Sequence, residues 1–168
     1  LVKKDSKHTN LYVIDRGLSS LDNFNAINEY NGKFDGRIKT NRNMEVVESL
    51  MKEDTDTDLG NLELYEDNIV HLYDNEEKKY CETPYRVIKA RFKQPRDTTR
   101  PANKGKVRRV ENEVFLITND FGLTPKQVAE AYRRRWDIEV FFKFLKQNLS
   151  FSHFVSTSEN GIKVILYM

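Results

Sequence analysis

The stretch YRRRWDIEVFFKFLKQNL, residues 132–149, contains the only Trp of the chain, three consecutive Arg and a single Glu among basic and aromatic neighbours. An α-helix turns by about 100° per residue. Four residues of the stretch would therefore share an arc of roughly 60°: Tyr132, Arg135, Glu139 and Lys146. The pattern predicts a helix that presents one carboxylate in a row with cations, which is a setting suited to phosphate groups.

An apolar stripe is predicted beside this polar edge. It consists of Ile138, Phe142, Leu145 and Leu149. We expect the stripe to pack on a core and Trp136 to pack against a sheet. A simpler interpretation of the polar edge is that Arg135, Glu139 and Lys143 form ion pairs on a solvated face. The spacing within the helix does not by itself decide between the two interpretations.

The tetrapeptide Thr124-Pro125-Lys126-Gln127 predicts where this helix begins. Thr124 suits the N-cap, the proline suits the first helical position, and the glutamine can complete a capping box. The helix is expected to run to about Asn148. A second helix is expected after Ser156, where Glu159 could complete another capping box.

The first 40 residues predict an α/β arrangement. LYVI (11–14) is a short β-prone run that ends in the turn-forming sequence Asp-Arg-Gly. Ser19 or Ser20 can then cap a helix that Gly32 ends. The apolar positions of that helix share one face: Leu21, Phe24 and Ile27. KFDGRIKT (33–40) is a second strand candidate, so strand–helix–strand order predicts a right-handed crossover.

Residues 41–112 differ in character from the segments on either side. LELYE, NIVHLYD, KKYCE and YRVIKARF are short β-branched or aromatic runs between polar turns, which predicts a small antiparallel sheet. Residues 93–109 hold seven Lys or Arg and one Asp, and we expect a mobile basic loop there. EVFLITN (113–119) is a further predicted strand.

Composition places the chain among soluble globular proteins. The net charge of +2 is too small to indicate a partner. A single cysteine, Cys81, excludes an internal disulfide framework and a cysteine-based zinc site, and it fits a reducing cytoplasm. No apolar run approaches the roughly 18 residues that a membrane-spanning helix requires.

The spacing Tyr-x2-Arg-x3-Glu-x6-Lys, met by Tyr132, Arg135, Glu139 and Lys146, resembles the motif of the DDE transposases of bacterial insertion sequences, in particular the IS-four group. The surrounding helix is similar to the family pattern Y-x-x-R-W-x-I-E-x-F-F-K-x-L-K. LYVIDRG (11–17) resembles the strand that carries the second catalytic Asp of the family. The likeness covers most of residues 10–40 and 113–168.

The resemblance implies an α/β fold with an RNase H-like core and a site of three acids, Asp, Asp and Glu, that binds two Mg²⁺ or Mn²⁺ ions. Asp15 matches the second Asp and Glu139 matches the third acid. Two divalent ions activate the attacking oxygen and stabilise the leaving oxygen of a phosphodiester, and carboxylates are suitable ligands for such hard cations. For Asp15 the alternative is a turn former without catalytic function.

The resemblance also implies double-stranded DNA as partner, at transposon ends and at the target. In the family, the Arg and Lys of the motif contact end phosphates, which corresponds to Arg135 and Lys146, and Tyr132 would orient the same backbone. Further cations are candidates for DNA contact: Arg134, Lys143, Arg96, Arg100, Lys104 and Lys106. For the basic loop a solvated connector is the alternative, and DNA contact there would be strongly salt-dependent.

The resemblance divides the chain into three parts. Residues 1–40 would carry the second Asp as part of the core, residues 41–112 would form a β-rich insertion, and residues 113–168 would carry the last strand and the core helices. No candidate for the first Asp precedes Asp15. The chain begins without Met and ends in an apolar run, so we expect a fragment whose core is incomplete on the N-terminal side and which does not cleave DNA alone.

Family members act as dimers, are bacterial and cytoplasmic, and associate with the nucleoid. They free a 3′-OH at the transposon end and join it to target DNA. In relatives a Trp of the insertion can stack on a flipped base, but the only Trp of this chain, Trp136, lies on the predicted helix. Here Tyr73, Tyr80 or Tyr85 could take that role, although packing within a sheet is the alternative for all three.

Two other functions remain open from the sequence. The chain could be a DNA-binding remnant of a transposase without catalysis, or a protein-interaction domain in which the motif is a coincidence. The acidic segment 54–60 resembles a calcium loop, but its Gly is displaced by one position and Tyr65 stands where Glu is required, so a solvated turn is expected.

Overall fold

The computed structural model describes residues 10–94 and 112–148, with only the backbone of Phe142, Leu145, Lys146 and Asn148. The chain forms two compact units, the sheet unit Leu1–Arg133 and the helix unit Arg134–Met168. The described elements, in order, are β1 (Leu11–Ile14), the 3-10 turn η1 (Arg16–Leu18), α1 (Leu21–Glu29), β2 (Lys33–Ile38), β3 (Met44–Ser49), β4 (Leu62–Asp74), β5 (Lys79–Phe92), β6 (Glu113–Thr118) and α2 (Pro125–Asn148).

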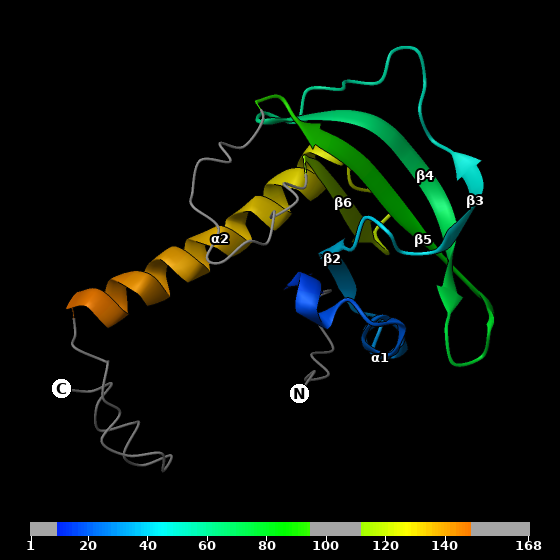
Figure 1. The fold of residues 1–168 in the computed structure, drawn as a ribbon, viewed down its shortest axis with the longest axis horizontal. Coiled ribbons are helices and arrows are strands. Elements are labelled where there is room, and N and C mark those ends of the chain that lie inside the picture. Colours follow the sequence, from blue (N-terminus) through cyan, green and yellow to red (C-terminus); the bar gives the residue numbers. More distant parts are fainter. Residues whose placement is uncertain (1–9, 95–111, 149–168) are drawn as a thin grey trace, which may run out of the picture. The chain divides into compact units, whose positions relative to one another are not determined.

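A six-stranded sheet in the order β1-β2-β6-β5-β4-β3 forms the centre of the sheet unit (Figure 1). β1 and β2 are parallel and are joined through α1, as the strand–helix–strand pattern predicts. The other pairings are antiparallel. The mixed α/β class is therefore confirmed. β6 pairs directly with β2 and is the strand that precedes α2 in the chain.

Local sequence accounts for α1. Ser20 is its N-cap, with the side chain accepting a hydrogen bond from the backbone amide of Asn23 at 3.3 Å. The three predicted apolar positions are buried: Leu21, Phe24 and Ile27. Phe24 stacks on Phe34 of β2 with ring centroids 4.6 Å apart. This contact fixes α1 on one face of the sheet.

The β-rich segment forms fewer and longer strands than predicted. The four short runs merge into β4 and β5, which form a curved hairpin in Figure 1. Register shifts between Leu64 and Glu66 and between His71 and Tyr73 let the ladder bend without ending. β3 was not predicted. These strands continue the sheet of β1, β2 and β6 rather than forming a separate sheet.

Apolar residues lie on both faces of the sheet. The first core packs beneath α1 and contains Leu21, Phe24, Ile27, Phe34, Ile38, Val70, Leu72, Tyr85, Val87, Phe115 and Ile117. The second core contains Leu59, Leu62, Leu64, Ile88, Ala90, Val114, Leu116 and Val128. Val128 belongs to the first turn of α2 and is fully buried, so the beginning of that helix covers the second face.

The three tyrosines considered for base stacking take part in packing. Tyr85 is fully buried beneath α1, and its hydroxyl donates to Asn25 at 3.2 Å. Tyr73 and Tyr80 meet edge to face across the β4–β5 hairpin, with centroids 5.2 Å apart. Burial makes Tyr85 unsuitable as a stacking platform.

The predicted start of α2 is confirmed, and the described part of the helix runs to Asn148. The amide of Thr124 donates to the side-chain oxygen of Gln127 at 2.8 Å, and the amide of Gln127 donates to the Thr124 hydroxyl at 3.3 Å. This reciprocal pair is a capping box. None of the helices in the described ranges is long and apolar enough to cross a membrane.

Two packing predictions for α2 concern residues of the helix unit. Trp136, expected to pack against a sheet, is 61% exposed, and Ile138, expected to pack on a core, is 57% exposed. Both residues follow Arg133, where the sheet unit ends, so their packing against the sheet stays a prediction. The stripe residues Phe142 and Leu145 are described by backbone alone, and Leu149 lies outside the described residues.

Loss of the capping box is expected to lower stability. Thr124→Ala removes the acceptor for the Gln127 amide and should decrease the free energy of unfolding by about 1 kcal/mol. Urea denaturation followed by circular dichroism measures the change. Thr124→Ser keeps the hydroxyl and should lie close to wild type. Equal losses in both variants would contradict a role of this hydroxyl.

Asp35 of β2 makes stability depend on pH. Burial raises the pKa of this carboxyl from 3.8 to about 8. Between those pH values the Asp35 carboxyl is ionised in the unfolded chain and protonated in the folded chain. The free energy of unfolding should therefore fall by about 1.4 kcal/mol for each unit of rising pH. Asp35→Asn should remove this slope between pH 5 and pH 8 in denaturation measurements. Asp22→Asn, at an exposed position, should retain it, and a variant slope equal to that of wild type would contradict the assignment.

Candidate active site

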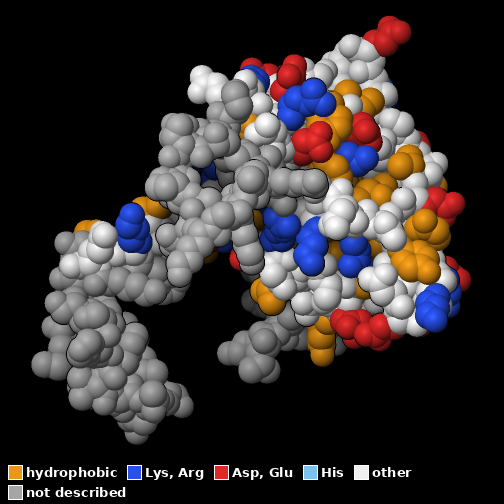
Figure 2. All heavy atoms as spheres, viewed as in Figure 1, with side chains coloured by type: hydrophobic (Ala, Val, Ile, Leu, Met, Phe, Trp, Pro, Cys, Tyr) orange, Lys and Arg blue, Asp and Glu red, His pale blue; other side chains and the backbone are white. Residues whose placement is uncertain are grey.

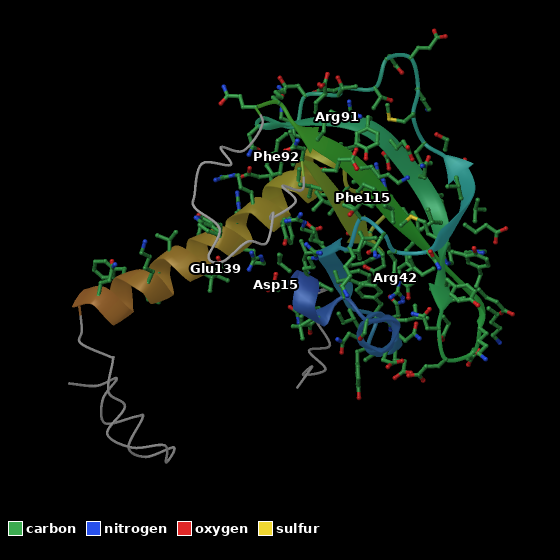
Figure 3. The ribbon with its side chains drawn as sticks, in the orientation of Figure 1. Asp15, Arg42, Arg91, Phe92, Phe115 and Glu139 are labelled. Atoms are coloured by element: carbon green, nitrogen blue, oxygen red, sulfur yellow. The ribbon has the colours of Figure 1, made fainter. Side chains whose placement is uncertain are left out.

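Asp15 follows the last residue of β1, at the carboxyl end of the strand (Figure 3). It is the N-cap of η1, and its Oδ1 accepts a hydrogen bond from the Arg16 amide at 2.7 Å. Its backbone carbonyl accepts from the Leu18 amide at 2.9 Å. The turn-forming interpretation is therefore confirmed as a structural role. The same turn leaves Asp15 exposed at the strand end.

Strand register places Asp15 on the same face of the sheet as two other charged residues. Val13 pairs with Asp35 across β1 and β2, and side chains two positions apart share a face. Asp15 has extended backbone angles, so its side chain shares the face of Val13. On β2, the side chains of Asp35 and Arg37 share that same face. The face that the start of α2 covers therefore carries Asp15, Asp35 and Arg37.

Glu139 lies in the helix unit, within α2. Its Oε1 accepts a hydrogen bond from Arg135 Nη1 at 2.5 Å, and the side chain is 46% exposed. Arg135 and Glu139 therefore form the i,i+4 ion pair of the simpler interpretation. An exposed pair of this kind contributes little to stability. It does keep a carboxylate and a guanidinium together at the surface.

Asp15 and Glu139 belong to different units. The expectation that their carboxylates face each other across a metal site therefore stays a prediction. Within residues 10–94 and 112–148 there is no cluster of three or more His, Cys, Asp or Glu that could hold a metal ion. The acidic segment 54–60 forms a turn, in which Asp58 Oδ1 accepts from the Gly60 amide at 2.7 Å. Asp58 also pairs with Lys93 at 2.8 Å.

The predicted DNA-contact residues are distributed over the described and undescribed parts of the chain. Arg134 and Lys143 are exposed on α2, whereas Tyr132 is half-buried against the second core. Lys146 lies on α2 with its backbone alone described. The loop cations lie outside the described residues: Arg96, Arg100, Lys104 and Lys106. A helix expected after Ser156 also lies outside them.

The sheet face above the first core is not uniformly basic. Acidic and basic side chains are interspersed over the long strands in Figure 2. Lys89 pairs with Glu66 at 2.7 Å and lies 5.2 Å from the ring centroid of Phe115, which is labelled in Figure 3. Arg91 lies 4.8 Å from the ring centroid of Tyr65. Both cations are therefore engaged in contacts within the sheet.

Sequence reasoning did not single out Asp35. The residue is fully buried, and neither carboxylate oxygen has a hydrogen-bond partner. Burial is the main cause of its raised pKa, and the nearby amides of Gly36 and Tyr132 lower the pKa by less. One feature of the sequence could have indicated a buried acid. Asp35 is a charged residue inside the strand KFDGRI (33–38), where the alternation of side chains between the two faces directs it towards a covered face.

Comparison with known proteins agrees with the motif. Residues 2–168 match the family described as "Transposase DDE domain". A protein from Synechocystis sp., named as a transposase for insertion sequence element IS4SA, is 37% identical over 46 residues, which are 27% of this chain and 14% of that protein. A Geobacillus stearothermophilus protein, named as a transposase for insertion sequence element IS5377, is 34% identical over 50 residues. This match covers 30% of the chain and 13% of the relative.

A third relative is a Sinorhizobium fredii protein named as transposase y4zB, which is 29% identical over 68 residues, or 40% of this chain and 19% of that protein. The matched segments thus span less than a fifth of each of these relatives. The family match extends over nearly the whole chain. The chain therefore belongs to the transposase DDE-domain family, among the transposases of insertion sequences.

Proposed function

We propose that this chain contributes the second and third catalytic acids, Asp15 and Glu139, to the RNase H-like catalytic domain of an insertion-sequence transposase. The whole protein would cut phosphodiesters at transposon ends and join the 3′-OH to target DNA. The observation that carries the proposal is the family match over residues 2–168 together with the Tyr-Arg-Glu-Lys spacing on α2.

The chemistry of the two acids fits divalent metal ions. Carboxylates are the preferred protein ligands of Mg²⁺ and Mn²⁺. Two such ions, when bound, would stabilise both the attacking and the leaving oxygen of the displacement. Asp15 offers its carboxylate from a turn fixed by two hydrogen bonds, and Glu139 offers one from a helix. Arg135 pairs directly with the Glu139 carboxylate at 2.5 Å.

The arrangement of the strands supports the RNase H-like proposal. A parallel pair joined by a helix, followed after a long interval by an antiparallel strand and a helix, places an acid at a strand end and another on a helix. Residues 41–112 would be the insertion between these two acids. The active complex would be a dimer that holds two transposon ends.

The exposed cations of α2 would bind the DNA backbone. Arg134 and Lys143 are exposed, and Arg135 is partly exposed beside Glu139. Arginine binds phosphate oxygens through a planar group with several donors. Tyr132, Lys146 and the loop cations would extend this surface. Such contacts position the DNA backbone without selecting a sequence.

Metal binding tests the two acids. Glu139→Gln and Asp15→Asn should each weaken Mn²⁺ binding by at least tenfold, because each removes one ligand charge from the proposed site. Isothermal titration calorimetry of the intact transposase gives the dissociation constants. Asp137→Asn, an exposed acid on the same helix, is the matched control and should bind Mn²⁺ like wild type. Unchanged binding in Glu139→Gln would exclude its metal role.

DNA binding tests the basic edge of α2. Arg134→Gln should reduce the slope of log K against log salt concentration by about 1, since one phosphate contact would be lost. Fluorescence anisotropy with a duplex of the transposon end, between 50 and 300 mM salt, measures the slope. Lys79→Gln, a cation of the β4–β5 hairpin, is the control. An unchanged slope in Arg134→Gln would remove that residue from the interface.

A DNA-binding remnant without catalysis is the second candidate. The Arg135–Glu139 ion pair favours it, because the pair gives Glu139 a structural role that needs no metal. The purified 168-residue chain is expected to bind duplex DNA but not to nick supercoiled plasmid in Mg²⁺ or Mn²⁺, because it supplies only two of the three acids. Nicking that disappears in Glu139→Gln would show that this chain is sufficient for cleavage. In the intact protein, duplex binding without any cleavage, left unchanged by Glu139→Gln, would favour the remnant.

A further inference from the structure

Asp35 is the starting point, because its environment does not suit a charge. The residue lies in the middle of β2, between β1 and β6, and is fully buried. Neither carboxylate oxygen accepts or donates a hydrogen bond. An unpartnered buried carboxylate is costly, and in practice such a group takes up a proton.

The polar groups that face Asp35 are engaged elsewhere. On β6, the Thr118 hydroxyl donates to the Phe34 carbonyl at 2.6 Å and accepts from the Asp120 amide at 3.0 Å. On β2, Lys33 Nζ donates to the Asn119 carbonyl at 3.3 Å. The Thr118 hydroxyl and the Lys33 ammonium are thus hydrogen-bonded to partners other than Asp35.

The remaining charged groups on this face lie one step further away. Arg86 of β5 pairs with Asp67 at 2.7 Å and also donates to the Leu123 carbonyl. Arg37 lies two positions along β2, and Asp15 follows β1 beside it. From α2, the group close to Asp35 is the backbone amide of Tyr132, which lowers the pKa less than burial raises it.

The position of this contact along α2 is informative. Tyr132 is half-buried against the second core, and the sheet unit ends at Arg133. Because the Tyr132 amide lies close to the Asp35 carboxyl, Asp35 lies beneath the last turn of α2 that belongs to the sheet unit. The same turn begins the Tyr-Arg-Glu-Lys segment.

We propose that Asp35 is a proton-operated latch: the protonated carboxyl lets the turn of α2 at Tyr132 pack on β2, and release of that proton to solvent admits water beneath the turn and loosens it. The latch needs no metal ion and no DNA. The proton passes to water or buffer, and no covalent bond other than O–H breaks. The ionised carboxylate is then hydrated in the opened turn, where its charge is no longer desolvated.

The pH range of the latch follows from linkage. A buried carboxyl with a pKa of about 8 and an ordinary value of 3.8 in water favours any opening that hydrates it. The equilibrium constant for opening should rise about tenfold per pH unit towards pH 8 and then level off. A neutral residue at position 35 should abolish this rise.

Hydrogen exchange of the intact chain at pH 6, 7, 8 and 9 tests the proposal, with observed rates corrected for intrinsic exchange at each pH. In wild type, amides of residues 130–133 should lose protection by about tenfold per unit between pH 6 and pH 8. Asp35→Asn should make their protection independent of pH, and Asp35→Ala serves if the first variant folds poorly. Asp22→Asn, an exposed acid of the same unit, should behave as wild type.

Low guanidinium concentrations separate a local latch from a loss of global stability. Local opening exposes little surface, so exchange at residues 130–133 should be insensitive to the denaturant and faster than exchange in β6. If residues 130–133 and β6 share one opening constant and one denaturant slope, Asp35 acts only on global unfolding and the latch is excluded. Protection of residues 130–133 that does not change with pH in wild type would also exclude it.

Discussion

The pairing of β2 with β6 is the constraint on which the rest of the structure depends. These strands are far apart in sequence, and their junction is fixed by one side chain, Asn119. Its Oδ1 accepts from the Phe34 amide at 2.8 Å, and its Nδ2 donates to the Gly32 carbonyl at 2.9 Å. It also donates to the Asn28 side chain at 2.6 Å, which ties the end of α1 to the same point. An amide group can satisfy several backbone groups at once, so the junction is closed without a gap in hydrogen bonding.

That junction joins the parallel pair to the long antiparallel strands and gives the sheet two different faces. β1 and β2 also approach each other closely at Gly36. A Cβ added to Gly36 would lie 2.4 Å from Ile14 Cγ1, so only glycine fits against β1 at that position. α1 covers one face through stacked aromatic rings, and the first turns of α2 cover the other through Val128. The buried row beneath α2 contains a satisfied ion pair, Arg86 with Asp67, and the unsatisfied Asp35. The cost of burying charge is offset by ion pairing in Arg86 and Asp67, and it is avoided by protonation in Asp35.

The candidate site combines groups that have structural and chemical roles at the same time. Asp15 caps a turn and stands at a strand end, and Glu139 forms an ion pair and belongs to the family motif. Neither structural role excludes metal binding, because a carboxylate has several lone pairs. Arg134 is exposed on the same helix as Glu139.

The sequence by itself determined the local elements and the family. Periodicity and capping residues placed β1, α1 and α2 correctly, because a cap or an apolar face is decided by residues within one or two turns. The motif spacing identified the transposase family before any geometry was known. Only the tertiary structure decided that the β-rich runs merge into one sheet and that Asp35 is buried without a partner. Those outcomes depend on contacts between distant segments, and the identity of one residue does not reveal which surface will cover it.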